Sequence, residues 1–228
     1  MKLYKYESLA NLWHVLDMVL NGRLYCAHWD KLNDPLEGRY EIWLHKEEEN
    51  IRGEMTSVIE KKRKVCRIAA LSADPTHILL WSHYANGHKG VAVEVDIPRN
   101  DPHLEKVHYL PYWYTPVFSD NSQTEYTMRH LFTEKGSEWA YEREYRIITE
   151  EEFFLLHKPV IRVLVGPKGD AQQIKILEKA FWRKGRKVKI VSMQCNVLED
   201  QMRVFVPNSP LERIARKFAL QEQKKTKS

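Results

Sequence analysis

Three charged side chains alternate along a short stretch in the second half of the chain. Glu142, Glu144 and Arg146 lie two residues apart, and side chains at that spacing share one face of a β-strand. Charged groups on an internal strand are costly to bury unless they are paired or face a cleft. One interpretation is an ion-paired or solvated outer face. The other is the floor of a cleft, where Arg146 binds an anionic or carbonyl group and a glutamate acts as base or hydrogen-bond acceptor.

A second candidate stretch precedes a segment of strongly alternating hydrophobicity at residues 90–97. It contains Trp81, His83, Tyr84, His88 and Lys89, together with two glycines. Residues that bind or react are often held on a loop that a rigid scaffold positions. We expect the two aromatic side chains to stack on a planar ring, and His88 or Lys89 to meet a phosphate. Packing of a short helix by the same aromatic side chains is the structural alternative.

Two other chemistries have little support. His77, His83 and His88 are six and five residues apart, whereas two metal ligands on one helix face lie three or four apart. Cys26 and Cys66 lie in no motif that would lower the pKa of a thiol. We therefore predict no metal site, no cysteine nucleophile and no required cofactor.

A glycine-containing turn at residues 166–170 lies between an expected strand and an expected helix. Backbone N–H groups at such a helix start favour anions. The turn lacks the lysine–hydroxyl ending of a phosphate-binding loop and the three-glycine spacing of a dinucleotide fingerprint. We interpret it as a tight turn in which Asp170 caps the helix.

Hydrophobic periodicity and turn residues predict the elements that position these candidates. Ser8 is expected to start a helix that stops at Gly22, and Gly53 is a candidate break between two helices. The expected strands cover residues 3–6, 24–27, 65–72, 90–97, 107–109, 141–149, 161–165, 188–193 and 203–206. The expected helices cover residues 9–21, 40–64, 75–85, 121–135, 170–184 and 211–220.

This order predicts a single α/β (α+β) domain over residues 1–207, with a mixed, partly split sheet flanked by helices. A parallel β-α-β unit is expected over residues 161–193. Residues 208–228 are expected to form a C-terminal helix and a basic tail. No internal repeat or linker interrupts the chain.

Composition restricts the class of protein. Of the 228 residues, 43% are hydrophobic and 29% charged, which is ordinary for a globular protein. No apolar run approaches the roughly 18 residues that span a bilayer, and the N-terminus has no apolar signal-peptide region. Three unclustered cysteines fit a reducing compartment. We expect a cytoplasmic protein with no membrane partner and leave its oligomeric state open.

The net charge of +5 is unevenly distributed, because residues 183–228 contain twelve Lys or Arg and four Asp or Glu. Such a basic end can bind nucleic acid. It can equally be a solubilising tail, so both interpretations stay open.

Several motifs together resemble a known family. These are the start at residues 3–6, Asn33-Asp34-Pro35-Leu36-Glu37, the stretch at residues 80–91, and Trp139 with residues 141–146. In order and spacing they resemble a bacterial family catalogued as domain of unknown function 2971, over roughly residues 3–195. The stretch around Trp81 more loosely resembles proteins of abortive-infection loci. On this resemblance the candidate substrate-binding residues also include Tyr4, Asn33, Asp34 and Glu37.

The order strand, helix, strand at the start of the chain also resembles the ADP-ribosyltransferase fold. In that fold a second strand carries Ser or Tyr, matched here by Tyr25, and a late strand carries a key glutamate, matched by Glu142 or Glu144. The first strand departs from the pattern, because Tyr4-Lys5-Tyr6 stands where His or Arg is usual.

Together, these resemblances imply an enzyme that acts on NAD or a related nucleotide, in phage defence or as a toxin. The alternative is a non-enzymatic module that binds a ligand, a nucleic acid or a protein through the same cleft or the basic C-terminal end. Fold alone does not decide between them.

Overall fold

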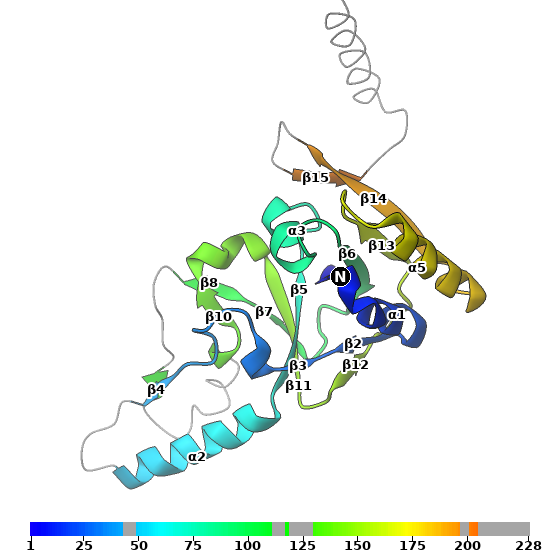
Figure 1. Cartoon of the computed structure of the whole chain (residues 1–228). Helices are drawn as coiled ribbons and strands as arrows, with labels where there is room; N and C mark the ends of the chain where they lie inside the picture. The colour runs from blue at the N-terminus through cyan, green and yellow to red at the C-terminus, as the bar shows by residue number, and fades with distance from the viewer. Residues whose placement is uncertain (43–48, 111–116, 119–129, 197–200, 205–228) are drawn as a thin grey trace, which may run out of the picture.

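The computed structural model describes residues 1–42, 49–110, 117–118, 130–196 and 201–204. Its centre is a nine-stranded, mostly antiparallel sheet flanked by helices (Figure 1). Eight strands run in the order β15-β14-β13-β6-β1-β5-β11-β7, and β3 also pairs with β5. The predicted α/β class, with a mixed sheet flanked by helices, is confirmed. The strands of the sheet are β1 (Lys2–Glu7), β3 (Ala27–His28), β5 (Arg67–Ser72), β6 (Val91–Asp96), β7 (Leu104–Lys106), β11 (Glu144–Thr149), β13 (Arg162–Val165), β14 (Lys189–Asn196) and β15 (Gln201–Val204).

Three two-stranded sheets surround this centre. The antiparallel pair is β2 (Arg23–Tyr25) with β12 (Phe153–Leu155). The parallel pairs are β8 (His108–Leu110) with β10 (Glu134–Gly136), and β4 (Glu41–Ile42) with β9 (Val117–Phe118).

Helix caps follow the signals in the sequence. The Ser8 side chain accepts a hydrogen bond from the Ala10 N–H at the start of the 3-10 helix Leu9–Asn11, which leads into α1 (Leu12–Asn21). Gly22 ends α1 with a positive φ of 66°, a conformation that glycine adopts without a steric penalty. Asp170 caps α5 (Ala171–Arg183) by accepting from the N–H groups of Gln172 and Gln173.

Different helices pack on the two faces of the sheet. Val91, Val93 and Val95 of β6 belong to the main hydrophobic core, together with residues of α1 and α5. Ala92 of the same strand packs on the opposite face with Leu80 and Trp81 of α3 (Ile78–Tyr84). Alternation along β6 therefore places two separate layers of side chains on either side of the sheet. Between β13 and β14, α5 completes the predicted parallel β-α-β unit.

Some predicted boundaries were wrong. Gly53 breaks no helix, because α2 (Glu49–Val65) runs through it, and Val65 belongs to this helix rather than to the following strand. Helix α3 begins at Ile78, after His77 as its N-cap residue. The predicted strand at residues 141–149 starts only at Glu144, because residues 137–142 form a 3-10 helix. Residues 134 and 135, predicted as the end of a helix, belong to β10. This strand pairs in parallel with β8, and a pairing between distant segments leaves no signal in local periodicity.

Several predicted elements lie outside the described residues. These are residues 43–48 and 121–129 of two predicted helices, the end of the 203–206 strand, and the whole of the C-terminal helix and tail. Within the described ranges, no helix combines the length and the apolar character that crossing a bilayer requires.

Candidate functional site

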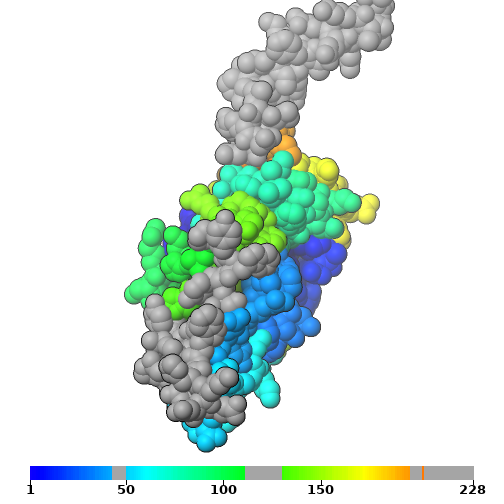
Figure 2. Space-filling view, turned by 90° about the vertical axis from the view of Figure 1, so that its left-hand side faces the viewer, coloured from blue at the N-terminus to red at the C-terminus, as the bar shows by residue number. Residues whose placement is uncertain are grey.

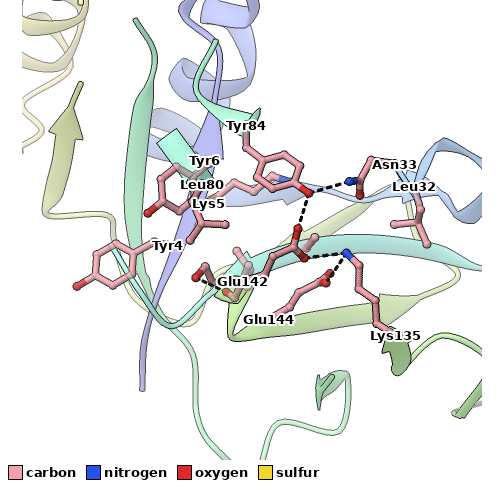
Figure 3. A pocket seen from close by; sticks show the side chains of 13 residues that line it. Tyr4, Lys5, Tyr6, Leu32, Asn33, Leu80, Tyr84, Lys135, Glu142 and Glu144 are labelled. Atoms are coloured by element: carbon pink, nitrogen blue, oxygen red, sulfur yellow. Dashed lines mark hydrogen bonds and ion pairs between the residues drawn. The ribbon is translucent and has the colours of Figure 1, made fainter. Parts of the chain in front are cut away.

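A pocket opens between β1, the end of β5, the C-terminal end of α3 and the 3-10 helix Ser137–Glu142 (Figure 3). Its volume is about 80 Å³. On the face of the molecule shown in Figure 2, the surfaces of α3, the 3-10 helix and the segment before β4 adjoin. The lining includes the aromatic residues Tyr4, Tyr6 and Tyr84, the apolar residues Leu32 and Leu80, and the polar residues Asn33, Lys135, Glu142 and Glu144.

Each oxygen of the Glu142 carboxylate accepts a hydrogen bond within the pocket. The Tyr84 hydroxyl donates to Glu142 Oε1 at 2.5 Å, and Lys135 Nζ donates to Oε2 at 2.7 Å. The side-chain amide of Asn33 donates in turn to the Tyr84 oxygen at 2.7 Å. This chain of hydrogen bonds, drawn in Figure 3, fixes the orientation of the Glu142 carboxylate.

Lys135 connects three carboxylates. Its ammonium lies 2.7 Å from Glu142, 3.2 Å from Glu37 and 3.3 Å from Glu144. It also lies 4.6 Å from the centre of the Trp139 ring, a favourable cation–π arrangement. The Lys135 side chain is only 1% exposed, so its charge is balanced inside the protein.

Arg146 is also fully engaged. It binds Glu144 through two nitrogens, at 2.7 and 3.1 Å, and donates a third hydrogen bond to the Phe132 carbonyl at 2.8 Å. The same guanidinium lies 2.8 Å from Glu37. The distances from Glu37 to Lys135 and Arg146 are those of ion pairs, but the angles are not those of hydrogen bonds. The Arg146 side chain is 1% exposed, so its charge, like that of Lys135, is balanced by the glutamates inside the protein.

The two neighbouring glutamates have different pKa values. Burial alone raises the pKa of Glu144, but the charges of Arg146 and then Lys135 outweigh burial and hold it at about 2. Burial raises the pKa of Glu142, the charge of Glu144 adds to the rise, and Lys135 opposes it only in part. Environments that separate the pKa values of adjacent carboxylates often assign them different roles. The charge of Arg146 thus favours the ionised form of Glu144, whereas burial makes Glu142 easier to protonate.

The surrounding donors keep their protons. Burial, and then the hydrogen bond to Glu142, raise the pKa of Tyr84. Burial lowers the pKa of Lys135, but the three glutamates raise it above its usual value. Tyr109, whose oxygen accepts from the Glu144 N–H at 2.8 Å, has its pKa raised to about 12, chiefly by burial. Glu142 therefore faces two groups that remain hydrogen-bond donors at neutral pH.

A turn explains how Glu142 and Glu144 reach the same lysine from different elements. Arg143, between them, ends the 3-10 helix with a positive φ of 46°. The Ser72 hydroxyl donates to the Glu142 carbonyl at 2.6 Å and fixes the turn to the end of β5. The two side chains therefore converge although Glu142 is not part of the strand.

The segment of residues 33–38 supplies the other side of the site. The buried Asp34 side chain accepts from the Leu36 N–H at 2.9 Å, and the Asp34 carbonyl accepts from the Glu37 N–H. A side chain that binds the backbone two residues later stabilises a turn. Asp34 thus shapes the segment that carries Asn33 to Tyr84 and Glu37 to Lys135.

The remaining predicted site residues lie elsewhere. Trp81 is completely buried where α3 packs on the sheet, and it donates to the Pro75 carbonyl at 2.9 Å. Tyr25 stacks on His14 beside β12, with ring centres 5.3 Å apart. His83 is exposed near Tyr141. These three, together with His88 and Lys89, are absent from the described residues that line the pocket.

His88 and Lys89 belong to a turn that packs against the 166–169 turn. The His88 carbonyl accepts from the Lys168 N–H at 3.1 Å, and the Gly90 carbonyl accepts from the Gly166 N–H at 2.9 Å. The two glycine-containing turns, which look independent in the sequence, therefore form one structural contact.

Sequence reasoning missed Lys135. It lies in a segment that periodicity assigns to a helix, and no motif surrounds it. The one available signal was indirect, because several buried acidic residues require a cation. Among the described residues, no three His, Cys, Asp or Glu side chains are grouped to hold a metal ion.

Comparison with known proteins gives one family match, over part of the site. No curated protein and no solved structure matches the chain, and the resemblance to ADP-ribosyltransferases finds no support there. One family matches over residues 80–147, a range that includes Tyr84, Lys135, Glu142, Glu144 and Arg146. For this part of the chain the resemblance predicted from the motifs is confirmed: residues 80–147 match the family described as "Protein of unknown function (DUF2971)".

Proposed function

We propose that the pocket is the active site of an enzyme that acts on NAD or a related ribose-containing nucleotide. The observation that carries this proposal is Glu142, which lines the pocket and has its carboxylate oriented by Tyr84 and Lys135. A ligand hydroxyl can donate to this carboxylate. Tyr4 and Tyr6 offer aromatic surface for a sugar or base.

The proposed reaction breaks the bond between ribose C1′ and the departing base, whose nitrogen takes the bonding electrons. Positive charge then develops on the ribosyl group, and a fixed carboxylate stabilises such charge when water is excluded. Water or another nucleophile forms the new bond to C1′ and releases its proton to solvent or to a carboxylate. Glu142 is better placed for this role than Glu144, because each Glu142 oxygen accepts from one donor only among the described residues. Glu144 Oε2 already accepts from both Arg146 and Lys135.

In the proposed binding mode the ribose enters the pocket and the remainder of a dinucleotide lies outside it. The substrate class is suggested by the sequence resemblance to the ADP-ribosyltransferase fold and by no contact among the described residues. A role in phage defence or as a toxin is suggested by sequence resemblance alone.

The test is Glu142→Gln, which keeps the shape of the side chain and removes its charge. We expect NAD turnover by the purified protein to fall at least 100-fold, the scale measured when one electrostatic stabiliser is removed from an active site. Glu138→Gln is the matched control, because Glu138 is exposed on the same 3-10 helix. It should retain full turnover, and both variants should remain folded.

A thermal-shift screen with NAD and ADP-ribose separates the enzyme from a binding module. A ligand at 100 times its dissociation constant adds about 2.7 kcal/mol of stability. Stabilisation that is lost in Glu142→Gln, without any turnover by the wild type, would favour the non-enzymatic module. Retained turnover in Glu142→Gln, or neither turnover nor stabilisation in the wild type, would contradict the proposal.

We also propose a cytoplasmic location. Cys26, Cys66 and Cys195 are all free thiols, as is usual for proteins of a reducing compartment. Fractionation of cells that express the tagged chain would test this.

A further inference from the structure

The outer face of α5 presents a row of cations. Lys175, Lys179 and Arg183 follow one another at intervals of four residues and are exposed. Residues four apart lie on the same side of a helix, about 6 Å apart along its axis. The opposite side of α5 buries Leu177 and Phe181 in the main core. In Figure 1, α5 lies at the edge of the molecule beside α1, away from the 3-10 helix of the pocket.

These cations have little counter-charge in their own segment. Residues 171–189 contain seven Lys or Arg and a single acidic residue, Glu178. In the described part of the chain, no ion pair involves Lys175, Lys179 or Arg183. Like charges four residues apart destabilise a helix by a few tenths of a kcal/mol per pair. The row therefore costs stability within the molecule and is complementary to an external anion.

An exposed aromatic side chain adjoins this row. Trp182, one residue before Arg183, is 80% exposed, more than any other large hydrophobic side chain described. Cations that follow a phosphate backbone, combined with an aromatic ring on which bases stack, form the usual surface for single-stranded nucleic acid. Trp182 can stack only on a base that is unpaired, because the bases of a duplex already stack on one another.

We propose that Lys175, Lys179, Trp182 and Arg183 bind single-stranded nucleic acid. An anionic membrane is the less suitable partner, because an interfacial helix inserts a broad apolar face. On this side of α5 only Trp182 and Ile176 are large, apolar and exposed. The surface is separate from the pocket, so the proposal does not depend on the reaction assigned to Glu142.

The test measures the anisotropy of a fluorescein-labelled, mixed-sequence 12-nucleotide RNA or DNA with the full chain over a salt series. The triple variant Lys175→Ala, Lys179→Ala, Arg183→Ala should bind at least tenfold more weakly. It should also reduce the slope of log K against log salt by about 2, since each phosphate contact on a single strand contributes roughly 0.7. Trp182→Ala should weaken binding about fivefold or more and leave the slope unchanged.

The matched control removes the same charge elsewhere. Lys61, Lys62 and Lys64 are exposed at the end of α2, and their replacement by alanine should change affinity less than twofold. Glu142→Gln should bind the oligonucleotide as the wild type does. Equal losses in the two triple variants, or unchanged affinity in Trp182→Ala, would overturn the proposal. The proposal would also be overturned if the protein bound a duplex with equal affinity or did not bind the oligonucleotide. Binding to phosphatidylserine vesicles instead of the oligonucleotide would overturn it as well.

Discussion

Lys135 is the residue on which the buried charges of the site depend. Its ammonium lies within 3.3 Å of Glu37, Glu142 and Glu144, and its side chain is 1% exposed. Removing one partner from a buried ionic cluster leaves the others uncompensated in a medium of low polarity, which typically costs about 3–5 kcal/mol. Lys135 is thus a positioning residue with a large structural contribution.

Lys135→Met, which keeps the length of the side chain and removes its charge, should lower the free energy of unfolding by about 3–5 kcal/mol at pH 8. Urea denaturation measures this change. Lys89→Met is the control: Lys89 is exposed, and a surface substitution of this kind should stay within about 0.5 kcal/mol of the wild type. Equal stability of Lys135→Met and wild type would show that the cluster contributes little.

The deficit of Lys135→Met should also depend on pH. Lys135 opposes the rise in the pKa of Glu142, so its removal raises that pKa further above the usual value of 4.5. A raised folded-state pKa gives stability that is present below the unfolded pKa and is lost as pH rises through the folded pKa. The deficit should therefore be larger at pH 8 than at pH 5, and the reverse order would contradict the proposed electrostatics.

At the scale of elements, α3 is fixed relative to the β-α-β unit by a contact between two turns. One contains His88 and Lys89, and the other covers residues 166–169. A Cβ atom on Gly166 would clash with the His88 carbonyl, and one on Gly90 would clash with the Glu7 carbonyl. Both obstacles are backbone atoms, which cannot move aside as the end of a flexible side chain can. Close backbone approach explains why glycine is required in these turns, and no phosphate-binding role is needed to explain it.

Gly166→Ala should therefore lower the free energy of unfolding by about 1–3 kcal/mol, the usual cost of overpacking. Gly53→Ala is the matched control, because a Cβ atom there meets nothing within 4 Å and Gly53 lies inside α2. Alanine in a helix interior is favoured over glycine by about 0.5–1 kcal/mol, so this variant should be more stable than the wild type. Urea midpoints of the two variants that shift in the same direction would contradict this interpretation.

At the scale of the molecule, one sheet joins distant parts of the chain. β1 from the N-terminus pairs with β5 and β6, and β6 pairs with β13. The main core combines residues of β1, α1 and α5. Elements that share a sheet and a core are expected to unfold together.

We accordingly expect one cooperative unfolding transition. Far-UV circular dichroism and tryptophan fluorescence should give the same urea midpoint, because secondary structure and core packing are lost in one step. The predicted single domain over residues 1–207 would be wrong if the two signals gave separate midpoints. Limited proteolysis would then locate the boundary.

Much of this fold could be predicted from local signals. The Ser8 and Asp170 caps, the left-handed Gly22 and the alternation in β6 each act over a few neighbouring residues, and each was found where the sequence indicated. The charged triplet 142–146 and the Asn33–Glu37 segment were also recognisable. A regular local pattern specifies an element because backbone geometry repeats at a fixed period.

Only the tertiary structure decided how these pieces form a site. The sequence did not indicate that Lys135 leaves a helical pattern for β10, or that Arg143 turns the chain so that Glu142 and Glu144 meet the same ammonium. Trp81 and Tyr84 lie on one helix, yet the first is buried and the second lines the pocket. The sequence thus determined which residues form strands, helices and turns. Contacts between distant positions decided which charged groups meet, because pairing in a buried cluster depends on separation in space and not along the chain.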